Sequence, residues 1–227
     1  MRNTRTAGWA AIAFVAVVVT LNVVENVGLG RPEPGAAAEE MARWASDATA
    51  YLWTSTLLVP VAWVLLVLVT ATMWERARSA ERNMFAPMLA LLGSAMTMGT
   101  LSAAIAADAV LISSIDALSV ESVEVLSGFT TVLFLLNWVA LAVTLFGLSR
   151  TTLDLGVAPR WMDRPTIAGS GLLLVGSMQS AAVLGGVLPG LLLGLAGFAI
   201  WLLFLLIAGI RLVRTDRSES TLTAAAA

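Results

Sequence analysis

The residues of this chain that could do chemistry begin with Glu25, which ends a long apolar run and is flanked by Asn22 and Asn26. The three share one helical face, because Asn22 and Asn26 are four positions apart. A carboxylate inside a membrane segment is costly and marks a candidate functional site. One interpretation is a proton or cation site in which Glu25 titrates and both amides orient it. The alternative is that Glu25, about one turn from Gly28, simply reaches water at the membrane interface.

Three further polar residues fall in apolar surroundings. Asp108 ends one apolar segment, so Asp108 and Glu25 could face one cavity if their helices were neighbours; otherwise Asp108 begins an acidic exterior loop. Asn137 and Gln179 lie deeper in later segments. We interpret both amides as hydrogen-bonding across helices, worth about 0.6–2 kcal/mol, with a substrate contact as the alternative.

The residue types that are absent exclude most chemistry. The chain has no His and no Cys, and all 13 of its basic residues are Arg. Ordinary zinc, haem and iron–sulfur ligation need His or Cys, and Schiff-base chemistry needs Lys. General acid–base catalysis is left with carboxylates and the single tyrosine, Tyr51. We therefore expect no catalytic residues, no metal, no cofactor and no enzymatic activity, and a net charge of −2 indicates no nucleic-acid partner.

The elements that carry these residues are predicted to be membrane helices. Of the 227 residues, 59% are hydrophobic and only 12% are charged, whereas soluble domains carry about 25% charged residues. The mean hydropathy is +0.89. The pattern predicts an all-α polytopic bundle, a single domain over residues 1–213, followed by a tail at 214–227 that we expect to be disordered. The six predicted spans are 8–28, 51–74, 84–107, 128–148, 166–188 and 191–212.

Two amphipathic segments are expected on the exterior side. Prolines 32 and 34 end the first span. Residues 36–50 look like a surface helix that leads into the second span. Ile115, Leu118, Val123 and Leu126 predict a separate interfacial helix within the acidic stretch 108–127.

The arginines predict the orientation of the bundle. Eleven of the 13 fall at the N-terminus and in alternate connections, and only Arg31 and Arg43 fall on the other side. Because positive residues collect on the cytoplasmic face, we expect both termini to be cytoplasmic. A cleaved signal peptide ending near Ala36–Ala38 is the alternative for the first span, although its apolar stretch is long for that role.

Small residues predict how the helices pack. Ala95, Gly99, Ala103 and Ala107 recur every four positions in the third span, which we therefore expect to be central. Ser177, Ala181 and Gly185 in the fifth span, with Gly190 and Gly194 at the entry of the sixth, predict a tight hairpin. The same faces could pair two copies of the chain or bind another membrane protein, and the lipid bilayer is the one partner that the composition requires.

The layout resembles a widespread bacterial family of six-span membrane proteins known as a domain of unknown function. The matching stretches are Ala36 to Trp74 and Phe129 to Gly176, the latter containing GLSRTTLDLGVAPRW. The resemblance implies a multi-pass protein of the bacterial plasma membrane, and no assigned activity.

Three functions remain open from sequence. The first is a non-enzymatic scaffold, regulator or subunit of a larger complex, which needs only packing stripes and topology. The second is a small proton- or cation-coupled transporter that uses Glu25 and possibly Asp108. The third, an intramembrane enzyme, is disfavoured by the missing acid–base residues.

Overall fold

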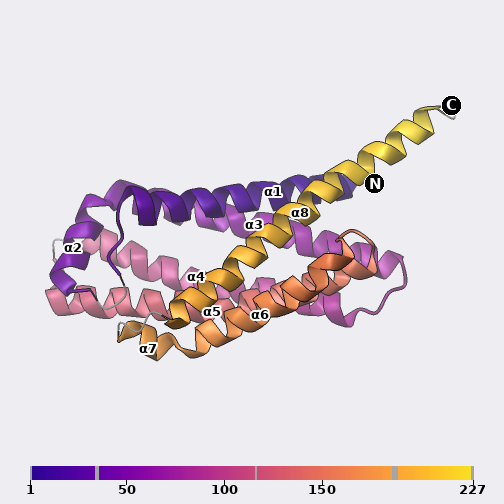
Figure 1. The fold of residues 1–227 in the computed structure, drawn as a ribbon. Helices are drawn as coiled ribbons and strands as arrows, with labels where there is room; N and C mark the ends of the chain where they lie inside the picture. Colours follow the sequence, from indigo (N-terminus) through magenta and orange to yellow (C-terminus); the bar gives the residue numbers. More distant parts are fainter. Residues whose placement is uncertain (1, 34–35, 116, 186–188, 226–227) are drawn as a thin grey trace.

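The chain folds as a bundle of long helices (Figure 1). The structure is a computed structural model that describes residues 2–33, 36–115, 117–185 and 189–225. Within those ranges every regular element is helical, as the all-α class predicts. The elements in chain order are α1 (Arg2–Val23), the π-helical turn η1 (Val24–Gly28), α2 (Ala38–Asp47), α3 (Thr49–Ser79), α4 (Phe85–Ser114), α5 (Val120–Asp154), the 3-10 turn η2 (Arg160–Met162), α6 (Asp163–Met178), α7 (Ser180–Leu184) and α8 (Pro189–Ala225).

Five of these helices are long and apolar enough to cross a membrane. They correspond to the first four predicted spans and the last, and most are longer than expected, because they continue beyond the apolar stretch into polar residues. The candidate membrane helices, each of which contains a long apolar window, are Thr4–Gly28, Thr49–Ser79, Phe85–Ser114, Val120–Asp154 and Pro189–Arg214.

The predicted fifth span, residues 166–188, is not one continuous helix. It is divided between α6 and the single turn α7, with the break at Gln179, and its last three residues lie outside the described ranges. A Cβ on Gly190 would lie 2.5 Å from the side chain of Gln179, so the start of α8 presses directly on this break. The five-helix count and the broken segment are therefore consistent with each other.

Small residues join α6 to α8, as the predicted hairpin requires. These two helices pack side by side, and Ser177, Gly190 and Gly194 are buried in the described part of the contact. A Cβ on Gly176 would lie 2.7 Å from the Cα of Gly194, so the two backbones touch at a pair of glycines. Ala181 and Gly185 are exposed and take no part.

The expectation that the third span is central is wrong. The central helix is α5, which packs against α2, α3, α4, α6, α7 and α8. On α4 the buried small residues include Ala90, Gly93 and Ala107, whereas Ala95 and Gly99, of the same predicted stripe as Ala107, are exposed. The period of four was read correctly, but α4 carries small residues on two faces, and only the tertiary packing determines which one faces α5.

The amphipathic helix predicted at residues 36–50 is present as α2. Its apolar face, including Met41, Trp44 and Ala48, forms a second small core with the adjoining ends of α3, α4 and α5. Figure 1 shows α2 lying across that end of the bundle, away from the chain's N-terminus.

The separate interfacial helix predicted within residues 108–127 is not formed. The helix α4 continues to Ser114, and α5 begins at Val120 behind the N-cap Ser119, whose hydroxyl accepts a hydrogen bond from the backbone N–H of Ser122. The helical spacing of Val123 and Leu126 was real, but it belongs to the first turns of α5, where these residues pack in the core beneath α2.

The last helix also differs from expectation. A disordered tail was expected from residue 214, whereas the backbone of α8 is helical as far as Ala225. Its membrane-compatible part ends at Arg214, two residues beyond the predicted end of the last span at 212.

Gly93→Ala should destabilise the bundle, because a Cβ there would lie 2.6 Å from the backbone nitrogen of Thr144 in α5. We expect a loss of about 1–3 kcal/mol, the usual cost of overpacking a close contact. Gly171→Ala on α6 is the matched control, because that glycine is exposed and nothing lies within 4 Å of a Cβ there. Thermal unfolding in mild detergent measures both, and an equal effect of the two changes would contradict this account of the α4–α5 contact.

Candidate functional site

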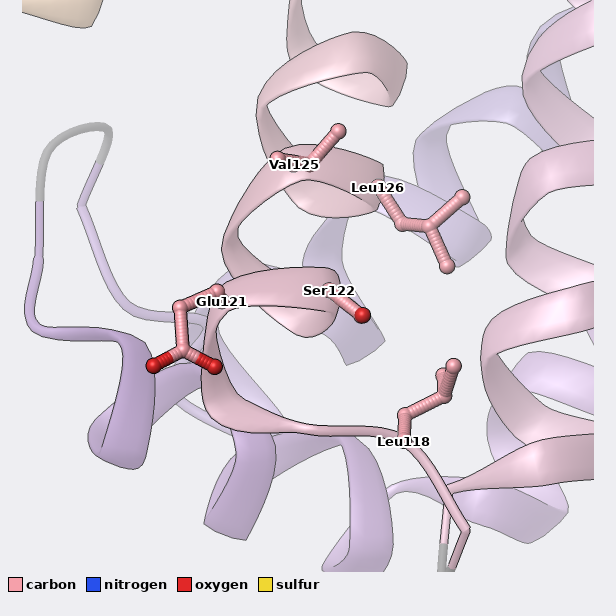
Figure 2. Close-up of a pocket in the computed structure, with 5 residues that line it drawn as sticks. All are labelled: Leu118, Glu121, Ser122, Val125 and Leu126. Carbon is pink, nitrogen blue, oxygen red and sulfur yellow. The ribbon is translucent and has the colours of Figure 1, made fainter.

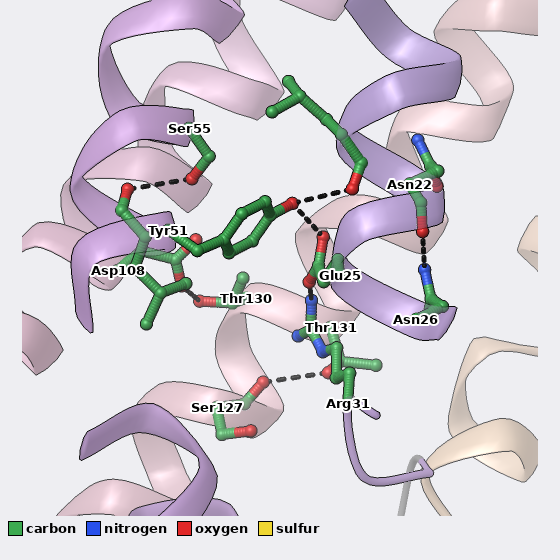
Figure 3. Close-up of polar contacts among 12 residues, drawn as sticks. Asn22, Glu25, Asn26, Arg31, Tyr51, Ser55, Asp108, Ser127, Thr130 and Thr131 are labelled. Atoms are coloured by element: carbon green, nitrogen blue, oxygen red, sulfur yellow. Dashed lines mark hydrogen bonds and ion pairs between the residues drawn. The ribbon is translucent and has the colours of Figure 1, made fainter. Parts of the chain in front are cut away.

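A polar cluster lies at the end of the bundle that α2 covers, and it contains two of the predicted site residues (Figure 3). We define the polar cluster as Glu25 on η1, Arg31 in the following loop, Tyr51 on α3, Asp108 on α4 and Thr130 on α5. Four segments far apart in sequence therefore meet at one place.

Glu25 is held by two partners. Arg31 forms an ion pair with its carboxylate, and the backbone N–H of Arg31 donates to the Glu25 carbonyl at 3.2 Å. The hydroxyl of Tyr51 lies 2.9 Å from Glu25 Oε2. The Glu25 side chain is 19% exposed, so its carboxylate is sheltered but still reachable from outside the protein.

Tyr51 can exchange partners. Its hydroxyl also lies 3.0 Å from the carbonyl oxygen of Leu21, and a phenol has one proton to donate. When Glu25 is ionised, the Tyr51 hydroxyl donates its hydrogen bond to the carboxylate. With Glu25 protonated, the acid can donate to the tyrosine, which then donates to Leu21. The cluster thus tolerates either protonation state of Glu25 without losing a hydrogen bond.

The two asparagines do not orient Glu25, contrary to one interpretation of the sequence. The amide nitrogen of Asn22 donates to the carbonyl of Val18 at 2.9 Å, and that of Asn26 donates to the carbonyl of Asn22 at 2.9 Å. Both amides therefore bond to the backbone of their own helix. The π-helical turn over Val24–Gly28 changes the helical repeat here, so the face inferred from a regular α-helix does not apply.

Asp108 joins the cluster from α4 without an ion pair to any described residue. Its Oδ1 accepts a hydrogen bond from the hydroxyl of Thr130 at 3.2 Å. No hydrogen bond or ion pair between described residues joins Asp108 to Glu25 or Arg31, so the two predicted carboxylates lie at the same end of the bundle without a direct contact. Helix α3 lies between their helices, and Figure 3 shows Tyr51 positioned between the two acids.

Arg31 is the sole cation of the cluster as defined, and it serves two groups. Besides the ion pair with Glu25, its guanidinium lies over the ring of Trp44, 5.4 Å from the ring centroid. It therefore ties the loop to both η1 and α2. With both acids ionised the cluster has two negative charges and one positive charge, so the uptake of one proton or one monovalent cation would balance it.

The two deeper amides have separate roles. Asn137 is buried at 2% exposure, and its Oδ1 accepts a hydrogen bond from the hydroxyl of Thr100 at 3.0 Å. This bond joins α5 to α4, as expected of an amide that stabilises a helix pair. Gln179 lies at the break between α6 and α7, far along the chain from the cluster, and packs against Gly190.

A shallow hollow of about 420 Å³ lies at the start of α5 (Figure 2). Its lining is mostly apolar, and Figure 2 shows Glu121 and Ser122 projecting from different sides of one helical turn. These two side chains do not converge on a common point, so the hollow has no paired groups for catalysis. Its lining residues are Leu118, Glu121, Ser122, Val125 and Leu126.

No metal site was expected, and among the residues that the structure describes there is no group of three or more His, Cys, Asp or Glu side chains that could hold a metal ion. The sequence identified Glu25 and Asp108 but missed Arg31, Tyr51 and Thr130. An arginine beside two prolines, a tyrosine at a helix start and a threonine in an apolar run are each ordinary on their own, and only their tertiary contacts distinguish them.

Comparison of the chain with protein families, with curated proteins and with solved structures finds no match.

Proposed function

We propose that this chain is a six-span, non-enzymatic membrane protein that works by association, as a scaffold, regulator or subunit, with both termini in the cytoplasm of a bacterial cell. The support begins with the five long apolar helices. The arginine distribution supports the orientation, since positive residues collect on the cytoplasmic side.

The segment α6–α7 is proposed as the remaining span. A 16-residue helix such as α6 extends about 24 Å, short of the roughly 30 Å of a bilayer's hydrocarbon core. The further turn α7 supplies much of the difference. Broken helices are tolerated at membrane depth where protein covers the freed backbone groups, and α5 and α8 both contact α7.

The topology can be tested with single cysteines, because the natural chain has none. Leu118→Cys lies in the connection between α4 and α5, and Leu155→Cys lies just after α5, at the opposite end of that helix. In intact cells an impermeant maleimide should label position 118 from outside, while position 155 should label only after the cells are opened. Labelling of both from the same side would refute the six-span topology.

The observation that carries the association proposal is an outward face of α4. Ala95 and Gly99 are exposed there, and nothing lies within 4 Å of a Cβ built on Gly99. Leu92 and Met96 on the same helix are 55% and 47% exposed. In lipid, helices associate through close backbone contact at small residues, and a second copy of the chain presents the same face by symmetry. We therefore commit to a homodimer through α4.

Gly99→Leu should abolish the dimer while leaving the monomer folded, because the added side chain blocks the partner but meets nothing within its own chain. Gly171→Leu on α6 is the matched control, since a Cβ at that exposed glycine also meets nothing within 4 Å. Chemical cross-linking in lipid nanodiscs and mass measurement in mild detergent give the oligomeric state. A wild-type protein that is monomeric in both would overturn the homodimer.

A second candidate function, a proton- or cation-coupled carrier, is favoured by one observation. Arg31, the one cation of the cluster as defined, pairs with Glu25, and Asp108 has no ion pair to a described residue, so the cluster has an unbalanced negative charge when both acids are ionised. Intramembrane carboxylates of this kind mark proton relays and ion pathways in transporters.

The carrier predicts that Glu25→Gln abolishes pH-driven flux in proteoliposomes, because the amide cannot take up and release the proton. Glu124→Gln, an exposed acid at the start of α5, is the control and should leave the flux unchanged. Equal flux in the wild type and in Glu25→Gln would discard this function without affecting the dimer.

A further inference from the structure

A second cavity lies at the opposite end of the bundle from the polar cluster. Its volume is about 360 Å³, and it is bounded by the beginning of α1, the last turns of α3 and the residue that follows α5. It lies just past Trp74, where α3 changes from apolar to polar sequence. The lining residues are Thr4, Thr72, Glu75, Arg76, Ser79, Ala80 and Leu155.

Arg76 stands out in this wall because its charge has no partner among the residues that the structure describes. Its Nη1 is buried and makes no hydrogen bond, and Arg76 forms no ion pair within the described part of the chain. Arg31, Arg78 and Arg150, by contrast, each pair with a carboxylate. A buried guanidinium nitrogen without a partner costs free energy, and a bound anion would remove that cost.

The one acidic residue of the wall does not supply that partner. Glu75 forms an ion pair at 3.1 Å with Arg78, whose guanidinium in turn lies 5.2 Å from the ring centroid of Trp74. The acid of this wall is thus neutralised on the outer side of α3. The charge that remains at the cavity is the positive charge of Arg76.

The other polar groups of the wall indicate that the partner of Arg76 is a bound oxyanion rather than a carboxylate side chain of the protein itself. The hydroxyls of Thr4 and Ser79 make no hydrogen bond to the described residues, so each has a proton to donate. The hydroxyl of Thr72 already donates to the Leu68 carbonyl at 2.7 Å. One guanidinium and two free hydroxyls form a set of donors that suits the several oxygens of a phosphate group.

We propose that this cavity binds a phosphate group, either the phosphodiester of an anionic lipid headgroup or free inorganic phosphate. Arg76 supplies the charge, and Thr4 and Ser79 supply further hydrogen bonds. The position beside Trp74 suits the lipid source, because tryptophans favour the headgroup level and basic pockets between helices bind lipid phosphates there. A phosphate site at this cavity requires neither the α4 dimer nor transport.

The test uses the full chain in nanodiscs of zwitterionic phosphatidylcholine, with phosphatidylglycerol as the anionic probe. Retention of phosphatidylglycerol, measured by native mass spectrometry, should fall about tenfold in Arg76→Gln, since the change removes the charge-assisted hydrogen bonds to the phosphate. Arg82→Gln is the matched control, because Arg82 is an exposed arginine at the same end of the bundle that does not line the cavity, and its retention should stay within about twofold of the wild type. Equal losses in the two variants, or none in either, would overturn the site.

Stability separates a binding role of Arg76 from a structural one. In phosphatidylcholine alone, Arg76→Gln should unfold at the wild-type temperature or above it, because the arginine has no partner to lose. A large fall in the unfolding temperature there would show that Arg76 holds the fold and would contradict the proposal. Ser79→Ala changes an exposed residue and leaves Arg76 unchanged. This variant should weaken lipid retention about threefold. Unchanged retention in both Ser79→Ala and Arg76→Gln refutes the site.

The source of the phosphate is decided by a third arm. Inorganic phosphate added to wild-type protein in phosphatidylcholine should leave the unfolding temperature unchanged if the ligand is a lipid, and raise it if the ligand is free phosphate. A rise in unfolding temperature caused by phosphate must be absent in Arg76→Gln. If neither phosphatidylglycerol nor phosphate stabilises the wild type relative to that variant, the cavity is not a phosphate site.

Discussion

A polar group within an apolar bundle needs a partner inside the protein, and this constraint governs most of the contacts described above. Away from water each unsatisfied donor or acceptor costs free energy, so hydroxyls and amides bond to nearby carbonyls or across helices. Thr144 donates to the carbonyl of Ala140 at 2.8 Å, and Asn137 accepts from Thr100 on the neighbouring helix. Neutral groups such as the Trp138 indole N–H and the Thr97 hydroxyl also lack a partner, but Arg76 departs from this rule with a positive charge, and that charge is the reason to look for a ligand there.

The same constraint explains why charge collects at the two ends of the bundle. Glu25, Arg31 and Asp108 meet beneath α2, where Tyr51 and Thr130 supply hydroxyls. Arg150 and Asp163 form an ion pair of 2.6 Å at the opposite end, between α5 and α6. Between these ends the packing is made by apolar and small side chains. Such an arrangement suits a protein that works by association. The middle of the bundle then needs only complementary packing, and its ends need only paired charges.

Close backbone contact is the second determinant of the fold. Gly93 and Gly147 bring α4 against α5, and Gly176 and Gly194 bring α6 against α8, with the ring of Trp138 next to both of the latter glycines. Where helices come this near, the packing leaves no space for an added methyl group. The exposed Gly99 has no such neighbour in its own chain, and this difference is what makes the outward face of α4 a candidate contact with a second copy.

The amino-acid sequence alone determined the helical class, five of the apolar segments, the amphipathic α2 and the absence of residues for most catalysis, because these follow from composition and from periodicity along one chain. It also identified Glu25 and Asp108, since a carboxylate is conspicuous in an apolar run. Tertiary structure decided which face of α4 is buried, that α5 is central, that Gln179 marks a break, and that Tyr51, Arg31 and Thr130 join the two acids. These facts depend on which helices are neighbours and how each is rotated about its axis, and a pattern of residues along a single helix contains neither quantity.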